Sequence, residues 1–134
     1  MGLDCSFDAF HGAYSAFNRL RQFVAKSIGG SYPPHEDKGL DVEHWYFPDN
    51  YTGDKHKGLH EFFCHSDCDG EISPEMCKLV ADELEAELPK MEELAKTFDS
   101  AGHIAARGGY IAVVKKFIEG CRTAHEENKP LIFH

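Results

Sequence analysis

The sequence predicts an α+β fold in which a small sheet of about three short strands packs against three to four helices. Two observations predict it: apolar residues recur at spacings of three and four in four segments, and three short apolar runs suit strands. The chain has 134 residues, of which 42% are apolar and 28% are charged. These values are typical of a globular protein, so residues 1–134 are expected to form a single domain.

The first and last helices are predicted by long apolar stripes. The first is expected over residues 10–28, with Asp8 as its N-cap and Gly29 as the left-handed residue that ends it. The last is expected over Tyr110–Glu127, where an unusually wide apolar face indicates packing on two sides. Pro130 lies beyond its end, as is common after helices.

Two further helices are expected between Ser73 and Phe98. Ser73 suits an N-cap, and Pro74 suits the first turn because its missing N–H has no intrahelical partner there. Pro89 is expected to interrupt the run, because its ring opposes the carbonyl four residues earlier. The outer face of the first of these helices is expected to carry four acids: Asp82, Glu83, Glu85 and Glu87.

Strand signals are shorter than the helical ones. The best is Leu59–His65, which is rich in aromatic residues and contains no breaker, and weaker ones are Leu3–Cys5 and Leu131–Phe133. Val42–Phe47 is expected to pair with Leu59–His65 as a hairpin. Together these segments predict the small sheet.

The charge balance excludes one class of partner and favours another. Acids outnumber bases by 23 to 14, with a net charge of −9 and a sequence pI near 5.4. Nucleic-acid binding is not expected, because neutralising phosphates requires clustered Lys and Arg. An acidic helix face including Glu83 and Glu87 is instead expected to meet a basic protein surface, or to keep the chain in solution. No window approaches the ~18 apolar residues of a membrane span.

One loop carries residues suited to metal chemistry. His65, Asp67 and Asp69 alternate, so an extended backbone would place them on one side. The run resembles the middle of a calcium-binding EF-hand loop, but its first position is His65 and its last is Met76, which are poor ligands for that ion. A histidine with two carboxylates suits Mn²⁺, Fe²⁺ or Zn²⁺ better. The same carboxylates also suit a turn before a helix N-terminus, and this structural interpretation is the favoured one.

A metal-dependent hydrolase is the alternative function that follows from this loop. A divalent metal ion would be its cofactor, and a metal-activated water would attack the substrate. His11 and His103 would assist if the starts of the first and last helices lie near His65. A binding role is favoured over an enzyme, and no catalytic residue is assigned.

The cysteines predict reduced thiols. There are five: Cys5, Cys64, Cys68, Cys77 and Cys121. The odd number and the start of the chain, which has neither a basic nor an apolar signal region, lead us to expect a cytoplasmic protein. A zinc site from Cys64, Cys68, Cys77 and His65 has little support because no Cys-x-x-Cys pair occurs.

Three motifs carry a resemblance. Gly2-Leu3-Asp4, the run His11–Arg21 (HGAYSAFNRLR) and the run His65–Ile72 (HSDCDGEI) are similar to a group of small uncharacterised bacterial and bacteriophage proteins. The resemblance implies a phage or mobile-element setting, and with it an accessory role such as binding a host protein. It implies no reaction and no oligomeric state.

Overall fold

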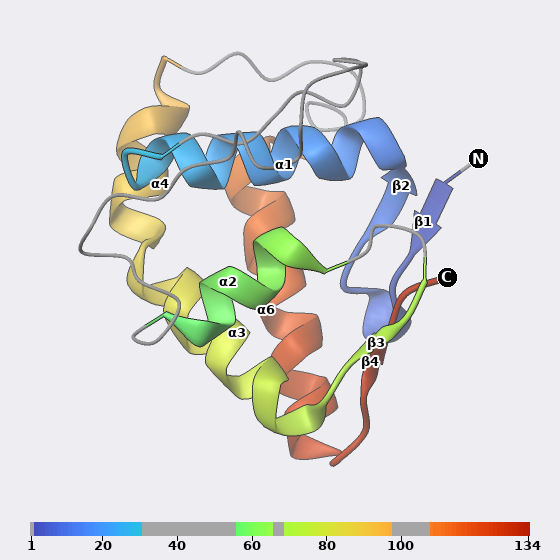
Figure 1. Cartoon of the computed structure of the whole chain (residues 1–134). Coiled ribbons are helices and arrows are strands. Elements are labelled where there is room, and N and C mark those ends of the chain that lie inside the picture. Colours follow the sequence, from blue (N-terminus) through green and yellow to red (C-terminus); the bar gives the residue numbers. More distant parts are fainter. Residues whose placement is uncertain (1, 31–55, 66–68, 98–107) are drawn as a thin grey trace.

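The computed structural model describes residues 2–30, 56–65, 69–97 and 108–134. It is mixed α and β, as the sequence predicts, with helices in the majority (Figure 1). The elements follow in the order β1 (Gly2–Asp4), η1 (Ser6–Asp8), β2 (His11–Ala13), α1 (Tyr14–Ser27), α2 (Lys57–Cys64), β3 (Glu71–Ile72), α3 (Pro74–Ala86), α4 (Leu88–Ala95), α6 (Tyr110–Glu126) and β4 (Leu131–Ile132).

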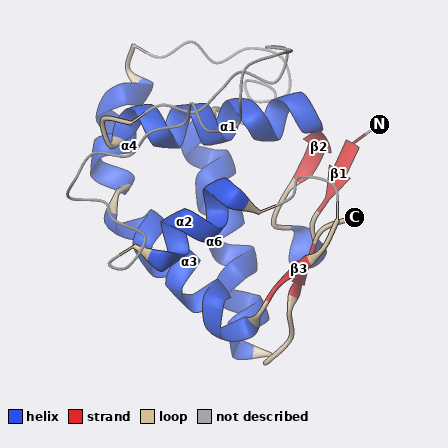
Figure 2. Ribbon diagram, in the orientation of Figure 1, coloured by secondary structure: helices blue, strands red, loops and turns tan. Residues whose placement is uncertain are grey.

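The helices form the body of the molecule. α3 packs most extensively on α6 and on α2, and α1 lies across one end, against α4 (Figure 1). The strands gather on one side of the helices (Figure 2). Within the described ranges, no helix has both the length and the apolar character needed to cross a membrane.

Two helix boundaries confirm the predicted signals. Ser73 is the N-cap of α3, and its hydroxyl oxygen accepts a hydrogen bond from the Met76 N–H at 3.2 Å. The helical run is interrupted at Glu87, and Pro89 lies in the first turn of α4, so the predicted interruption is confirmed. α6 covers almost all of the range predicted for the last helix.

The start of the first helix is corrected. α1 begins at Tyr14, because the preceding residues form β2 instead of a first helical turn. Asp8 therefore does not cap it: Asp8 belongs to η1, has a φ of 56°, and pairs with Lys116 of α6 at 2.9 Å. The predicted end is confirmed, since Gly29 adopts a φ of 84° directly after the helix.

The predicted single sheet is replaced by two antiparallel ribbons of two strands each. β1 pairs with β2, and β3 pairs with β4. Both predicted terminal strands exist, and the chain segments that carry them lie next to each other. Cys5 and Phe133 form an isolated antiparallel β-bridge, and the backbones of Asp4 and His134 exchange hydrogen bonds of 2.7 and 2.8 Å. The two ends of the described chain therefore lie side by side.

The expected strand Leu59–His65 is a helix. α2 covers most of it, and Leu59, Phe62 and Phe63 lie on its buried face. These residues are spaced by three and four, as on one face of a helix, but so short an apolar run also suits a buried strand. Periodicity alone therefore does not distinguish a helix from a strand here. Val42–Phe47, the expected hairpin partner, lies outside the described residues.

The core is rich in aromatic rings. Phe17 of α1 contacts Phe62 of α2, Phe117 of α6 and Phe133, with ring centroids 5.8 to 6.0 Å apart. Phe62 and Phe117 also contact each other at 5.4 Å. Each of these rings is almost fully buried, so three helices and the C-terminal segment share one core.

Candidate functional site

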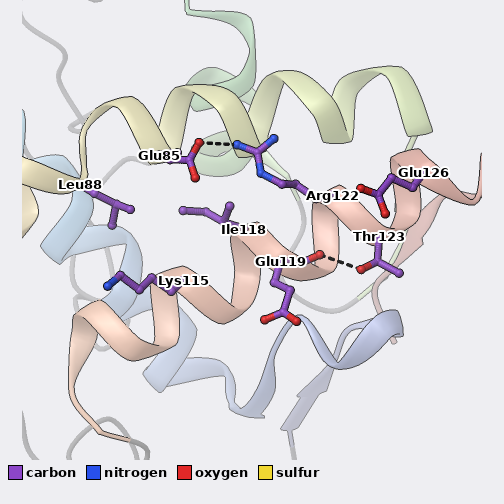
Figure 3. Close-up of a pocket in the computed structure, with 8 residues that line it drawn as sticks. All are labelled: Glu85, Leu88, Lys115, Ile118, Glu119, Arg122, Thr123 and Glu126. Atoms are coloured by element: carbon purple, nitrogen blue, oxygen red, sulfur yellow. Dashed lines mark hydrogen bonds and ion pairs between the residues drawn. The ribbon is translucent and has the colours of Figure 1, made fainter.

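An open groove lies along α6 (Figure 3). Its volume is about 490 Å³. Glu85 of α3 and Leu88 of α4 line one side. The α6 side is a stripe of residues spaced by three and four, namely Lys115, Ile118, Glu119, Arg122, Thr123 and Glu126.

A network of ion pairs crosses the middle of this open groove. Arg122 donates to Asp82 Oδ1 at 2.9 Å and to Glu85 Oε2 at 2.7 Å, and Lys78 donates to Asp82 Oδ2 at 2.7 Å. These bonds join α6 to α3. The hydrogen bonds from Lys78 and then Arg122 hold the pKa of Asp82 below its usual value, and the bond to Asp82 raises the pKa of Arg122.

The two ends of the groove differ in charge. Along the groove, Lys115 lies nearest the N-terminal end of α6, Glu119 near the middle of the helix and Glu126 at its C-terminal end (Figure 3). Among the described residues, neither of these two glutamates forms an ion pair, and both are exposed. Ile118 is buried and Leu88 half-buried, so they give the groove a short apolar floor. The site thus combines an apolar surface with two exposed carboxylates, those of Glu119 and Glu126, that have no cationic partner among the described residues.

The predicted metal loop is only partly described. His65 ends α2, and its Nε2 lies 3.2 Å from the Glu71 carbonyl oxygen. Its ring packs on Phe133 with centroids 4.1 Å apart. Asp69 is exposed, and Asp67 lies outside the described residues. Within the described ranges, no three His, Cys, Asp or Glu side chains come together to hold a metal ion, so the metal site stays a prediction.

The predicted pocket histidines are not brought to His65 by any described contact. His11 Nδ1 lies 2.6 Å from Asp4 Oδ1 across the β1–β2 ribbon, and both side chains are more than half exposed. His103 lies outside the described residues.

The two acids expected to contact a partner are engaged within the chain. The Glu83 carboxylate accepts hydrogen bonds from the Gly58 and Leu59 N–H groups at 3.0 to 3.2 Å. Glu87 is only 9% exposed and pairs with Lys90 at 3.1 Å, which corrects its expected place on the outer face. Glu87 lies three residues after Leu84 and seven after Val80, both of which are buried, so it continues the buried stripe of α3.

Sequence reasoning missed the α6 side of the groove. Glu119, Arg122 and Glu126 recur at spacings of three and four beside the apolar stripe, which was the available signal. That signal gains meaning only once α3 is known to pack on α6, because Glu85 and Leu88 complete the site.

Fold and site together define a small α+β protein with an amphipathic groove between helices. No family model, no curated protein and no solved structure matches the chain.

Proposed function

We propose that the chain is a small accessory protein that binds a basic segment of a protein partner in the groove along α6. One observation carries the proposal: Glu119 and Glu126 on the α6 side of the groove are exposed and form no ion pair with any described residue, and the apolar side chains of Ile118 and Leu88 line the same groove. Carboxylates of this kind attract Lys and Arg and steer association, whereas the apolar floor supplies area to bury.

The spacing of the groove residues defines the partner's chemistry. Glu119 and Glu126 are seven residues apart on α6, which is about 10 Å along the helix axis. Ile118 lies one residue before Glu119. A partner segment would therefore place an apolar side chain against Ile118, next to the first of two basic residues that face Glu119 and Glu126. A helical partner segment with one large apolar residue followed by Lys or Arg at two-turn spacing matches this arrangement.

The ion pairs of Arg122 support a preformed site. Arg122 fixes the spacing of α6 and α3 through Asp82 and Glu85, so the groove does not have to be created on binding.

Synthetic helical peptides with one Leu and two Lys at this spacing test the proposal. In the labelled protein, we expect their titration to shift the amide NMR signals of the α6 groove residues and of Glu85 and Leu88. The double variant Glu119→Lys/Glu126→Lys should weaken binding about tenfold or more, and binding should weaken steeply with salt.

The matched control is Glu75→Lys/Glu92→Lys, which makes the same charge change at exposed acids outside the groove. It should retain most of the affinity. Equal losses in both double variants, or signal changes spread over the whole surface, would show a non-specific charge effect and refute the groove as the site.

A further inference from the structure

A thiol and an imidazole lie side by side on the outer face of α2. His60 Nε2 and Cys64 Sγ are 3.9 Å apart, one helical turn from each other, and both residues are exposed. Neither lines the groove along α6. The pair therefore requires an explanation of its own.

The separation of the two atoms fits a shared soft metal ion. Zinc binds thiolate sulfur at about 2.3 Å and imidazole nitrogen at about 2.0 Å, so tetrahedral geometry places these two atoms about 3.5 Å apart. The observed 3.9 Å needs only a small side-chain adjustment to reach that bite. A thiolate with an imidazole selects Zn²⁺ or Cu⁺ over Mg²⁺ or Ca²⁺.

The helix that carries the pair is held firmly by the rest of the fold. Leu59, Phe62 and Phe63 are buried on its opposite face, and the Glu83 carboxylate caps its first turn. His60 and Cys64 are thus presented from a fixed backbone, so little ordering is needed to bring the two ligands together.

We infer that His60 and Cys64 form a two-ligand binding site for a soft metal ion, with Zn²⁺ as the expected divalent ion. Among the described residues no third ligand joins the pair, so water or donors from another molecule would fill the two remaining tetrahedral positions. On binding, the Cys64 thiol loses its proton to the solvent, the sulfur–metal bond forms, and His60 binds through a neutral ring nitrogen. This site differs from the predicted His65, Asp67 and Asp69 loop in its residues and in its preference for a softer ion.

Cobalt(II), a spectroscopic substitute for zinc, tests the inference on the full chain kept reduced with a phosphine. We expect a saturable near-ultraviolet band from thiolate-to-cobalt charge transfer, which added Zn²⁺ bleaches. Cys64→Ser should abolish the band. His60→Gln should weaken cobalt binding about tenfold or more, because substituting even a residue that only hydrogen-bonds a metal ligand typically lowers metal affinity by about that factor.

Two controls make the result specific. Cys68→Ser should keep the band, because the inference assigns the thiolate to Cys64, and circular dichroism should show that each variant keeps its helices. No band in the parent, a band that survives in Cys64→Ser, a band lost in Cys68→Ser, or unchanged affinity in His60→Gln would overturn the pair as a metal site.

Discussion

Both carboxylate oxygens of Glu83 accept hydrogen bonds from the Gly58 N–H, at 3.0 and 3.1 Å. The Leu59 N–H donates to the same carboxylate at 3.2 Å. α2 has no side-chain cap of its own, because His56 at its N-cap makes no capping hydrogen bond. A carboxylate of α3 therefore takes that role and also complements the positive end of the α2 dipole.

Replacing Glu83 by Ala should lower the free energy of unfolding by about 1–2 kcal/mol, because the first-turn N–H groups of α2 lose their acceptor. Urea unfolding followed by circular dichroism measures the change. Glu92→Ala is the control: Glu92 is exposed on α4, and its removal should cost less than about 0.5 kcal/mol. Equal effects of the two substitutions would contradict the capping role.

Gly58 is expected to tolerate no side chain, because α2 and α3 approach closely there. A Cβ at this position would lie 2.4 Å from the carbonyl carbon and oxygen of Leu79 and 2.6 Å from the Val80 nitrogen. Ala is the better helix former by about 1 kcal/mol, but the clash with backbone atoms should outweigh that gain. We expect Gly58→Ala to destabilise the fold by about 1–3 kcal/mol in urea unfolding.

The matched control for Gly58 is Gly12→Ala in β2. Its added methyl group would meet no atom closer than 3.5 Å, an ordinary contact with the Phe10 ring. Its stability should stay within about 1 kcal/mol of the parent. A Gly58→Ala variant as stable as the Gly12→Ala variant would show that α2 and α3 can separate without loss.

The free energy of unfolding should fall at low pH in part because Asp82 loses its interactions with Lys78 and Arg122 when it is protonated. Its folded-state pKa is lowered below the ordinary value of 3.8, so its contribution is present above that value and is lost as the pH falls through the folded pKa. Because the side chain is 41% exposed, the contribution should stay below about 1 kcal/mol. Arg122→Met should move the Asp82 pKa back up, measured by NMR titration of its carboxyl carbon. An unchanged Asp82 pKa in that variant would show that Arg122 does not stabilise the carboxylate.

Local signals of the fold could be predicted from the sequence, whereas features set by neighbouring elements could not. Ser73 before Pro74 and the break at Pro89 were confirmed because capping and ring geometry act within one turn. The strand predicted at residues 59–65 was wrong, because what fixes α2 is its burial against α3 and the cap from Glu83.

The candidate site divides in the same way. The acidic character of α3 was visible in the sequence, but which acids remain available depends on tertiary partners. The Glu83 carboxylate accepts hydrogen bonds from the first turn of α2, and Glu87 is buried between α3 and α4. Glu119 and Glu126 belong to a helix whose charges nearly balance, so composition gave no reason to select them.

The buried thiol of Cys5 should make the fold lose stability in alkali. Burial first, and then the Asp4 charge, raise the Cys5 pKa from 9.0 to about 12, against the opposing effect of Arg21. Since the unfolded thiol ionises near pH 9 and the folded one does not, stability is full below that pH. It falls as the pH rises, by about 1.4 kcal/mol per unit for this thiol until the folded pKa is reached. The hydrogen bond between Cys77 and Cys121 raises the pKa of Cys121 and lowers that of Cys77, so the effects of these two thiols on stability in alkali oppose each other.

Urea unfolding of the parent and of Cys5→Ala, at about pH 8 and about pH 10, isolates the Cys5 contribution. Other groups titrate in this range, but they are common to both proteins, so the difference in slope belongs to Cys5. The variant should be less stable than the parent at the lower pH, because it loses a side chain that is only 5% exposed, and the gap should narrow at the higher pH. A gap that stays constant would mean that Cys5 ionises as readily in the fold as in the unfolded chain.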